Sequence, residues 1–184
     1  MNKGILRIIE GDVTNPQITT PNEIVVIPHM CNNLRVMEAG VALALRNKWG
    51  KVYNTYMEMA QRNNKLYLGE ISKTTVEFIL NTTKVKIIVV NMIAQSGTVS
   101  QNNLIPIRYK ALINCMVKVF DYIETIKSKT SNPIVIHCPK FGSDLAGGNW
   151  NFILELIREI WLENGIDVVV YEFKADSAKW EIIE

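Results

Sequence analysis

Short runs rich in β-branched residues alternate along the chain with longer segments of helical period. The run Ile24-Val25-Val26-Ile27 is apolar at every position, which indicates a central strand covered on both faces. Later, the run 134–138 is followed by a glycine-rich turn, a helical segment at about 150–164 and a last run at 168–173. Strand, turn, helix and strand in this order are typical of a parallel crossover. The sequence therefore predicts a three-layer α/β fold, in which helices cover a mixed, largely parallel sheet of about six strands.

The elements between these segments follow from the same patterns. The stretch 81–84 consists of turn residues, so the strands on either side of it are expected to form an antiparallel hairpin. Pro106 suits a helix start, and apolar residues then recur at helical spacing, namely Leu112, Met116, Val119 and Ile123. Further strands are predicted at 5–9, 70–79 and 85–91, and further helices at 41–49, ended by Gly50, and at about 52–62.

Length and charge exclude several classes of protein. A chain of 184 residues has about the size of one domain, so we expect a single domain over 1–184, with its core at about 5–173 and a short C-terminal appendage. The net charge is only +2, without a dense basic cluster, so no nucleic-acid partner is expected. No apolar run approaches the roughly 18 residues that span a membrane, so no membrane partner is expected.

The cysteines bear on the redox environment. There are three of them, odd in number and widely spaced, which predicts neither a disulfide framework nor a zinc site. They favour a reducing, cytoplasmic location. The sequence leaves the oligomeric state open.

The glycine-rich turn 141–148 is the strongest candidate for a binding site. Ligands of an open α/β sheet bind beyond the carboxyl ends of its strands, and this turn is predicted to follow a strand directly. Three glycines, Gly142, Gly147 and Gly148, remove side chains where a backbone would approach an anion, and Asn149 can cap the helix that follows. A plain strand-to-helix turn that needs positive φ would use glycine in the same way. The turn alone therefore leaves both interpretations open.

Three further segments are predicted to follow strands, namely 11–14, 28–33 and 91–95. Asp12 offers a carboxylate to an exocyclic amine such as that of adenine, although aspartates also form turns and helix caps. His29 would suit an acid or base near neutral pH, whereas a buried, hydrogen-bonded histidine is the alternative, and His137 is interpreted as one. Asn32 and Asn33 would hold ribose hydroxyls, or else satisfy backbone groups of their own loop.

Together and in this order, the four segments resemble the macrodomain family, whose members bind ADP-ribose and its derivatives. The segment 11–14, Gly-Asp-Val-Thr, resembles the family's opening adenine-binding motif, and 27–49 resembles its loop and first helix around the distal ribose. The segment 91–95 with 106–109, and the segment 139–150, are similar to the branch of ADP-ribose-1''-phosphate phosphatases and relatives of terminal ADP-ribose protein glycohydrolase. The resemblance spans about residues 5–173, and its last motif is the most specific.

The resemblance implies a set of ligand-binding residues and neither a cofactor nor a metal. Asp12, followed by Val13, would meet the adenine amine, and Phe173 would contact the adenine ring. Asn32 would line the distal ribose together with Ala39, Gly40 and Val41. The backbone amides of the glycine turn would wrap the phosphates, at Gly142, Ser143, Leu145, Ala146, Gly147 and Gly148.

Three departures from the family pattern affect the expected chemistry. Glu38-Ala39-Gly40 stands where the distal-ribose loop usually reads glycine-alanine-glycine, which adds a negative charge. Gln95 and Ala146 occupy the positions of the glycohydrolase lysine and aspartate, so that chemistry should be absent. Ser143-Asp144 replaces cysteine and glycine. Because two like charges about 4 Å apart cost several kcal/mol at low effective dielectric, Asp144 should point away, carry a proton or meet a different group.

The function expected from this resemblance is hydrolysis of a terminal phosphate, as in ADP-ribose-1''-phosphate phosphatases. Asp144 would orient a water beside the phosphate, with His29 as the partner acid and Asn32 nearby. One alternative is a non-catalytic module that reads or sequesters an ADP-ribose-type nucleotide signal. A further alternative is a hydrolase that removes ADP-ribose from proteins. Glu38 and Asp144 favour a ligand with a hydrogen-bond donor or a cation at its distal end.

Overall fold

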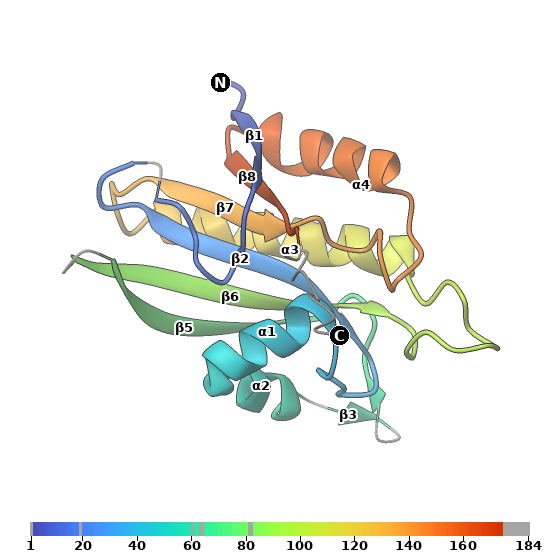
Figure 1. Ribbon diagram of the computed structural model, residues 1–184. Coiled ribbons are helices and arrows are strands. Elements are labelled where there is room, and N and C mark those ends of the chain that lie inside the picture. Colours follow the sequence, from blue (N-terminus) through green and yellow to red (C-terminus); the bar gives the residue numbers. More distant parts are fainter. Residues whose placement is uncertain (1, 19, 60, 63–64, 81–82, 175–184) are drawn as a thin grey trace, which may run out of the picture.

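The computed structural model describes residues 2–18, 20–59, 61–62, 65–80 and 83–174. Their main feature is one six-stranded sheet in the order β1-β8-β7-β2-β6-β5 (Figure 1). Adjacent strands are parallel throughout, except that β5 is antiparallel to β6. The strands are β1 (Leu6–Glu10), β2 (Ile24–Asn32), β5 (Ile71–Leu80), β6 (Thr83–Gln95), β7 (Ile134–Pro139) and β8 (Asp167–Glu172). The predicted mixed, largely parallel sheet is confirmed.

Helices cover both faces of this sheet, as Figure 1 shows. On one face lie α3 (Tyr109–Lys127) and α4 (Trp150–Ile157), the latter continued by the short π-helix η1 (Arg158–Leu162). On the other face lie α1 (Gly40–Lys48) and α2 (Gly50–Met57). Along β2, Val26 faces the core under α3 and α4, whereas Val25 faces the core under α1, and both are fully buried. The run 24–27 is therefore the central strand that its composition predicts.

The long helix α3 has the buried face that its spacing predicts. Its residues Leu112, Met116, Val119 and Ile123 are fully buried against the sheet. None of the helices within the described ranges is long and apolar enough to cross a membrane.

Two predicted boundaries are wrong in ways that affect the candidate site. The segments 28–33 and 91–95 are almost entirely strand, not loops after strands, because the parallel pairing of β2 with β6 continues to Asn32 and Gln95. Polar residues are tolerated in this buried stretch because they bond to each other: His29 Nε2 lies 2.6 Å from Asn91 Oδ1. The sequence pattern ends the strands too early because it treats these polar residues as exposed.

The second predicted helix is also too long. It ends at Met57, and Gln61–Arg62 forms a short strand, β3, that pairs with β4 (Lys65–Leu66). The chain turns back here because Leu66 returns to the end of β2, where its amide donates to the carbonyl of Asn33 at 3.0 Å. Gly50, predicted to end a helix, does separate α1 from the next helix but is itself the first residue of α2.

Candidate functional site at the carboxyl edge

Five parallel strands, β1, β8, β7, β2 and β6, end at the same edge of the sheet, which we call the carboxyl edge. The segments that leave these strands contact one another. The amide of Gly11 donates to the carbonyl of Glu172 at 3.1 Å, and the amide of Gly97 donates to Asn33 Oδ1 at 2.8 Å. The fold therefore brings the predicted segments 11–14 and 141–148 and the loop after β2 to one edge, the arrangement typical of ligand sites in α/β proteins.

The glycine turn presents unused backbone donors at this edge. Two hydrogen bonds close the turn. The amide of Gly147 donates to the carbonyl of Asp144 at 2.8 Å, and the amide of Gly148 donates to the carbonyl of Gly142 at 2.7 Å. By contrast, the five successive amides of residues 142–146 donate to no acceptor among the described residues. Successive unpaired amides in a turn form a concave site for an anion.

The glycines of this turn are also required by its own packing. A Cβ on Gly148 would lie 2.5 Å from the carbonyl oxygen of Gly142, and one on Gly147 would lie 2.9 Å from the carbonyl oxygen of Leu104. Gly142 and Gly147 have φ of 80° and 68°, a region that favours glycine. The turn therefore needs its glycines in order to fold, and the binding of a phosphate by its unpaired amides stays a prediction.

Replacing Gly148 with alanine should destabilise the protein. Because the new Cβ would meet a backbone oxygen that cannot rotate away, we expect a loss of about 1–3 kcal/mol in the free energy of unfolding, measured by urea denaturation. The matched control is Gly50→Ala, since no atom lies within 4 Å of a Cβ at Gly50. Equal stability of the two variants would contradict the packing role of Gly148.

Asp12 lies at the end of β1 as predicted, and its carboxylate is exposed. Its Oδ1 accepts from the amide of Thr14 at 2.8 Å and its Oδ2 from Thr14 Oγ1 at 2.9 Å. These bonds form a turn and leave lone pairs that face solvent. The neighbouring Val13 is buried, while Phe173 just beyond β8 is 73% exposed.

Tyr171 fixes the loop after β1, a role that sequence reasoning missed. Its hydroxyl accepts from the amide of Gln17 at 2.8 Å and lies 2.8 Å from His137 Nδ1. Burial raises the pKa of Tyr171 to about 12, so the hydroxyl keeps its proton and donates it to His137. The signal for this role in the sequence is one hydroxyl that follows the three apolar residues 168–170. His137 is a buried, hydrogen-bonded histidine, as interpreted.

His29 does not reach the carboxyl edge. It is fully buried within β2, bonded to Asn91, with Nδ1 3.7 Å from the sulfur of Cys31. Burial lowers the pKa of His29 to about 4, and the bond to Asn91 offsets only part of that effect. A neutral imidazole keeps one N–H, which His29 donates to Asn91, and this N–H is far too weak an acid to protonate a substrate near neutral pH. This environment contradicts the acid role predicted for His29.

Asn32 is likewise engaged within the protein. Its Nδ2 donates to the carbonyl of Val36 at 2.6 Å, and its Oδ1 accepts from the amide of Leu34 at 2.9 Å and from the hydroxyl of Tyr56 at 3.1 Å. The side chain is 6% exposed. Asn32 therefore shapes the loop after β2, and its predicted contact with ribose or phosphate stays a prediction. Asn33, bonded to Gly97, also satisfies the backbone, the alternative that the sequence left open.

The amino end of α1 is open to solvent. Glu38, Ala39 and Gly40 are exposed, and Val41 is partly buried against the core under α1. Ala39 is the N-cap residue and no side chain caps the helix, so its first amides keep their donors. Gly40 has φ of 54°, and no atom lies within 4 Å of its missing Cβ. The predicted distal-ribose residues thus border open space beside β2.

The remaining turn residues divide into exposed and buried positions. Leu145 is 52% exposed, whereas Ala146 is buried. Ser143 donates its hydroxyl to the carbonyl of Lys140 at 3.3 Å. Asp144 is exposed, and its carboxylate has no hydrogen-bond or ion-pair partner within the described part of the chain. Asp144 is therefore a free charge at the rim of the turn.

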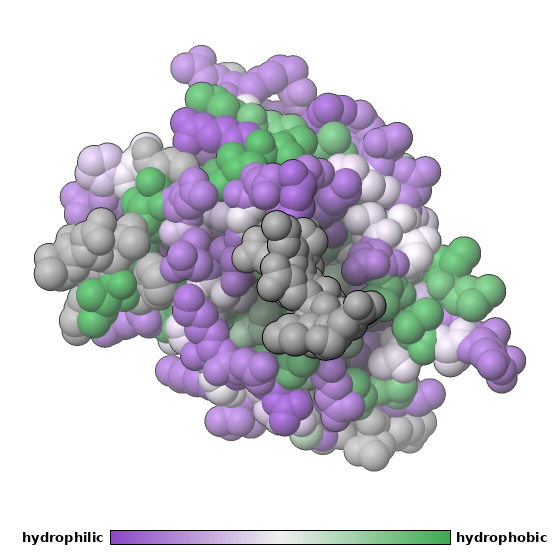
Figure 2. Space-filling view, in the orientation of Figure 1, coloured by the Kyte–Doolittle hydropathy of each residue, from purple (hydrophilic) through white to green (hydrophobic). Residues whose placement is uncertain are grey.

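The loop 96–105 projects from the carboxyl edge beside the glycine turn (Figure 1). Apolar side chains gather on this projection, whereas most of the face in view is a mixture of polar and apolar residues (Figure 2). Val99, Leu104 and Ile105 are 47%, 70% and 59% exposed. The amide of Ile107 donates to the carbonyl of Ala146 at 3.3 Å, which ties this loop to the turn.

Comparisons with known proteins agree with this arrangement. No family model and no curated protein matches the chain. A solved structure of a protein of unknown function from Bacteroides thetaiotaomicron is 31% identical, with a TM-score of 0.70, over 92% of this chain and 99% of that chain. A macrodomain protein from Streptomyces coelicolor is 26% identical, with a TM-score of 0.66, over 91% and 98% of the two chains. A Thermosipho africanus DarTG in complex with ADP-ribose is 14% identical, with a TM-score of 0.62, over 84% of this chain and 42% of that chain.

Proposed function

The chain belongs to the macrodomain family, and on this premise we propose that its carboxyl edge binds ADP-ribose or an ADP-ribose derivative. The observation that carries the proposal is the run of five unpaired amides at 142–146. Backbone amides directed at an anion need no reorganisation when it arrives, which suits a diphosphate. The ADP-ribose complex of the Thermosipho africanus protein, which has the same fold, supports the choice of ligand.

The order of the strands supports an orientation of the bound ligand along the carboxyl edge. The exposed carboxylate of Asp12 follows β1, and the exposed ring of Phe173 follows β8. The unpaired amides of the turn follow β7, and the open amino end of α1 follows β2. Three strand spacings span roughly 14 Å. Adenine at Asp12, the diphosphate at the turn and the distal ribose near Gly40 would follow this order.

Binding without turnover is the function that the geometry supports best. The acid assigned to His29 is absent from the edge, and Gln95 and Ala146 supply neither a nucleophile nor a proton. The proposal is tested by calorimetric titration with ADP-ribose, for which we expect one site per chain. Absence of heat with ADP-ribose and with ADP-ribose-1''-phosphate would overturn it.

Hydrolysis of a terminal phosphate is a second candidate, favoured by the unpaired carboxylate of Asp144. Asp144 would take a proton from a water as that water attacks phosphorus; the bond from phosphorus to the C1'' oxygen breaks, and that oxygen takes up a proton from solvent, so inorganic phosphate and ADP-ribose leave. Phosphate release from ADP-ribose-1''-phosphate tests it, with Asp144→Asn as the variant that keeps the shape of the side chain. An equal rate in Asp144→Asn excludes this role, and release of ADP-ribose from a modified protein would favour the de-ADP-ribosylating alternative.

A further inference from the structure

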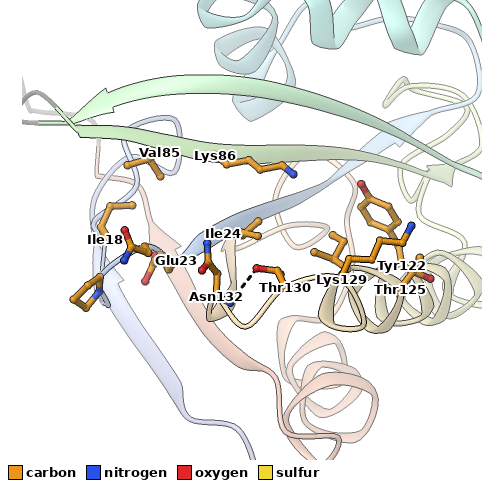
Figure 3. A pocket seen from close by; sticks show the side chains of 13 residues that line it. Ile18, Glu23, Ile24, Val85, Lys86, Tyr122, Thr125, Lys129, Thr130 and Asn132 are labelled. Atoms are coloured by element: carbon orange, nitrogen blue, oxygen red, sulfur yellow. Dashed lines mark hydrogen bonds between the residues drawn. The ribbon is translucent and has the colours of Figure 1, made fainter.

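A cavity of about 830 Å³ lies at the opposite edge of the sheet from the proposed nucleotide site. It opens between the first residue of β2, Ile24, the beginning of β6 and the end of α3 (Figure 3). Because β2 and β6 run from this edge to the carboxyl edge, the cavity shares no residue with the glycine turn, and from the loop after β1 it includes only residues at and beyond Ile18, not Asp12. Its volume is in the range of pockets that hold small molecules.

The cavity combines an apolar wall with unpaired donors. Ile18, Ile24 and Ile126 contribute apolar surface. Lys86 on β6 and Lys129 after α3 also line it, and Figure 3 shows the side chain of Lys86 extending along the cavity toward the side where Tyr122 and Lys129 lie.

Within the part of the chain that the structure describes, these donors are not used by other protein groups. Among the described residues, neither Lys86 nor Lys129 forms a hydrogen bond or an ion pair, and the hydroxyl of Tyr122 forms none. The ammonium of Lys73 lies 4.7 Å from the centre of the Tyr122 ring, which adds positive charge nearby. Burial raises the pKa of Tyr122, so the hydroxyl remains a donor.

The acid that lines the cavity does not neutralise these lysines. Glu23 is 3% exposed, and its Oε1 lies 2.9 Å from His137 Nε2. Its Oε2 accepts from the amide and the hydroxyl of Thr20 at 2.8 and 3.0 Å. The carboxylate is thus directed into the core, and the other charged side chains that line the cavity are those of Lys86 and Lys129.

We propose that this cavity is a second binding site, for a small amphipathic anion that carries a phosphate or carboxylate on an aromatic or aliphatic body. The anion meets Lys86, Lys129 and the hydroxyl of Tyr122, while the body packs on the isoleucines. The two lysines come from separate elements, a strand and the end of a helix, so the site exists only in the folded chain. The proposal does not depend on what the carboxyl edge binds.

The test uses phenyl phosphate as the probe with the full chain, followed by amide chemical shifts in NMR spectra. We expect shifts at Ile24, Lys86 and Ile126, weaker shifts with inorganic phosphate, and an unchanged response when ADP-ribose is present. The double variant Lys86→Glu, Lys129→Glu should lose at least tenfold in affinity for phenyl phosphate. The matched control is Lys86→Arg, Lys129→Arg, which keeps both charges.

Three results would overturn the proposal. They are shifts confined to the carboxyl edge, displacement of phenyl phosphate by ADP-ribose, and equal affinity in the charge-reversed and charge-conserving variants. A thermal unfolding scan of each variant shows whether it still folds, so that weaker binding is not mistaken for loss of the fold. Tyr122→Phe, which removes only the hydroxyl, should weaken binding a few-fold without changing that scan.

Discussion

The variant Leu145→Glu should bind ADP-ribose about 30- to 150-fold more weakly than the natural chain. Leu145 lies among the five unpaired amides and is 52% exposed, so the substitution adds a carboxylate at the proposed diphosphate position while removing little packing. Two like charges about 6 Å apart repel by about 2–3 kcal/mol at an effective dielectric of about 20. Calorimetric titration measures the loss directly.

The control for this prediction is Leu145→Gln, which has nearly the same length and no charge. It should weaken binding only a few-fold, and the gap between the two variants should narrow at high salt because the repulsion is screened. If Leu145→Glu bound ADP-ribose as tightly as Leu145→Gln, the diphosphate would not lie at this turn. Unfolding curves of both variants should coincide with that of the natural chain.

The second large effect is a loss of stability in mild acid that originates at His29. The pKa of His29 is lowered from 6.5 to about 4 by burial, so the unfolded state binds a proton more readily than the folded state. The contribution of His29 to the free energy of unfolding is therefore complete above about pH 6.5 and is lost progressively as the pH falls toward 4. Two and a half pKa units correspond to about 3 kcal/mol.

Urea denaturation between pH 4 and 7.5 measures this loss. His29→Gln, whose amide can still donate to Asn91, should have a flatter dependence, while His137, the other histidine of the chain, is present in both proteins. The carboxylates that titrate near pH 4 are present in both proteins. The difference between the two curves of unfolding free energy against pH therefore gives the contribution of His29 alone. Parallel curves would show that His29 is not held neutral by its surroundings.

The sequence predicts the order and type of the helices and strands well because the spacing at which apolar residues recur differs between helices and strands. The fully apolar run 24–27 is a central strand, and the four apolar residues of α3 are buried together. The helix after Gly50 is predicted too long because local propensity continues past Met57, whereas the return of Leu66 to the end of β2 is a long-range requirement.

The candidate site was predictable in position but not in the roles of its polar residues. The glycine turn and Asp12 lie at the carboxyl edge, as the order of strands and turns indicates. His29 and Asn32 have the right residue types in the right segment, but their partners, Asn91 and Val36, turn them inward. A single sequence gives the residue type and its place along the chain, not the partner that decides whether a side chain faces solvent.

The bond between the hydroxyl of Tyr171 and the amide of Gln17 has a consequence for the cost of ligand capture. Tyr171 belongs to β8 and is held by His137 of β7, so the loop carrying Asp12 is anchored to two neighbouring strands of the sheet. An anchored loop has few conformations to lose when a ligand arrives. Part of the conformational entropy of the loop around Asp12 is therefore lost when the protein folds, so less entropy is lost when a ligand binds there.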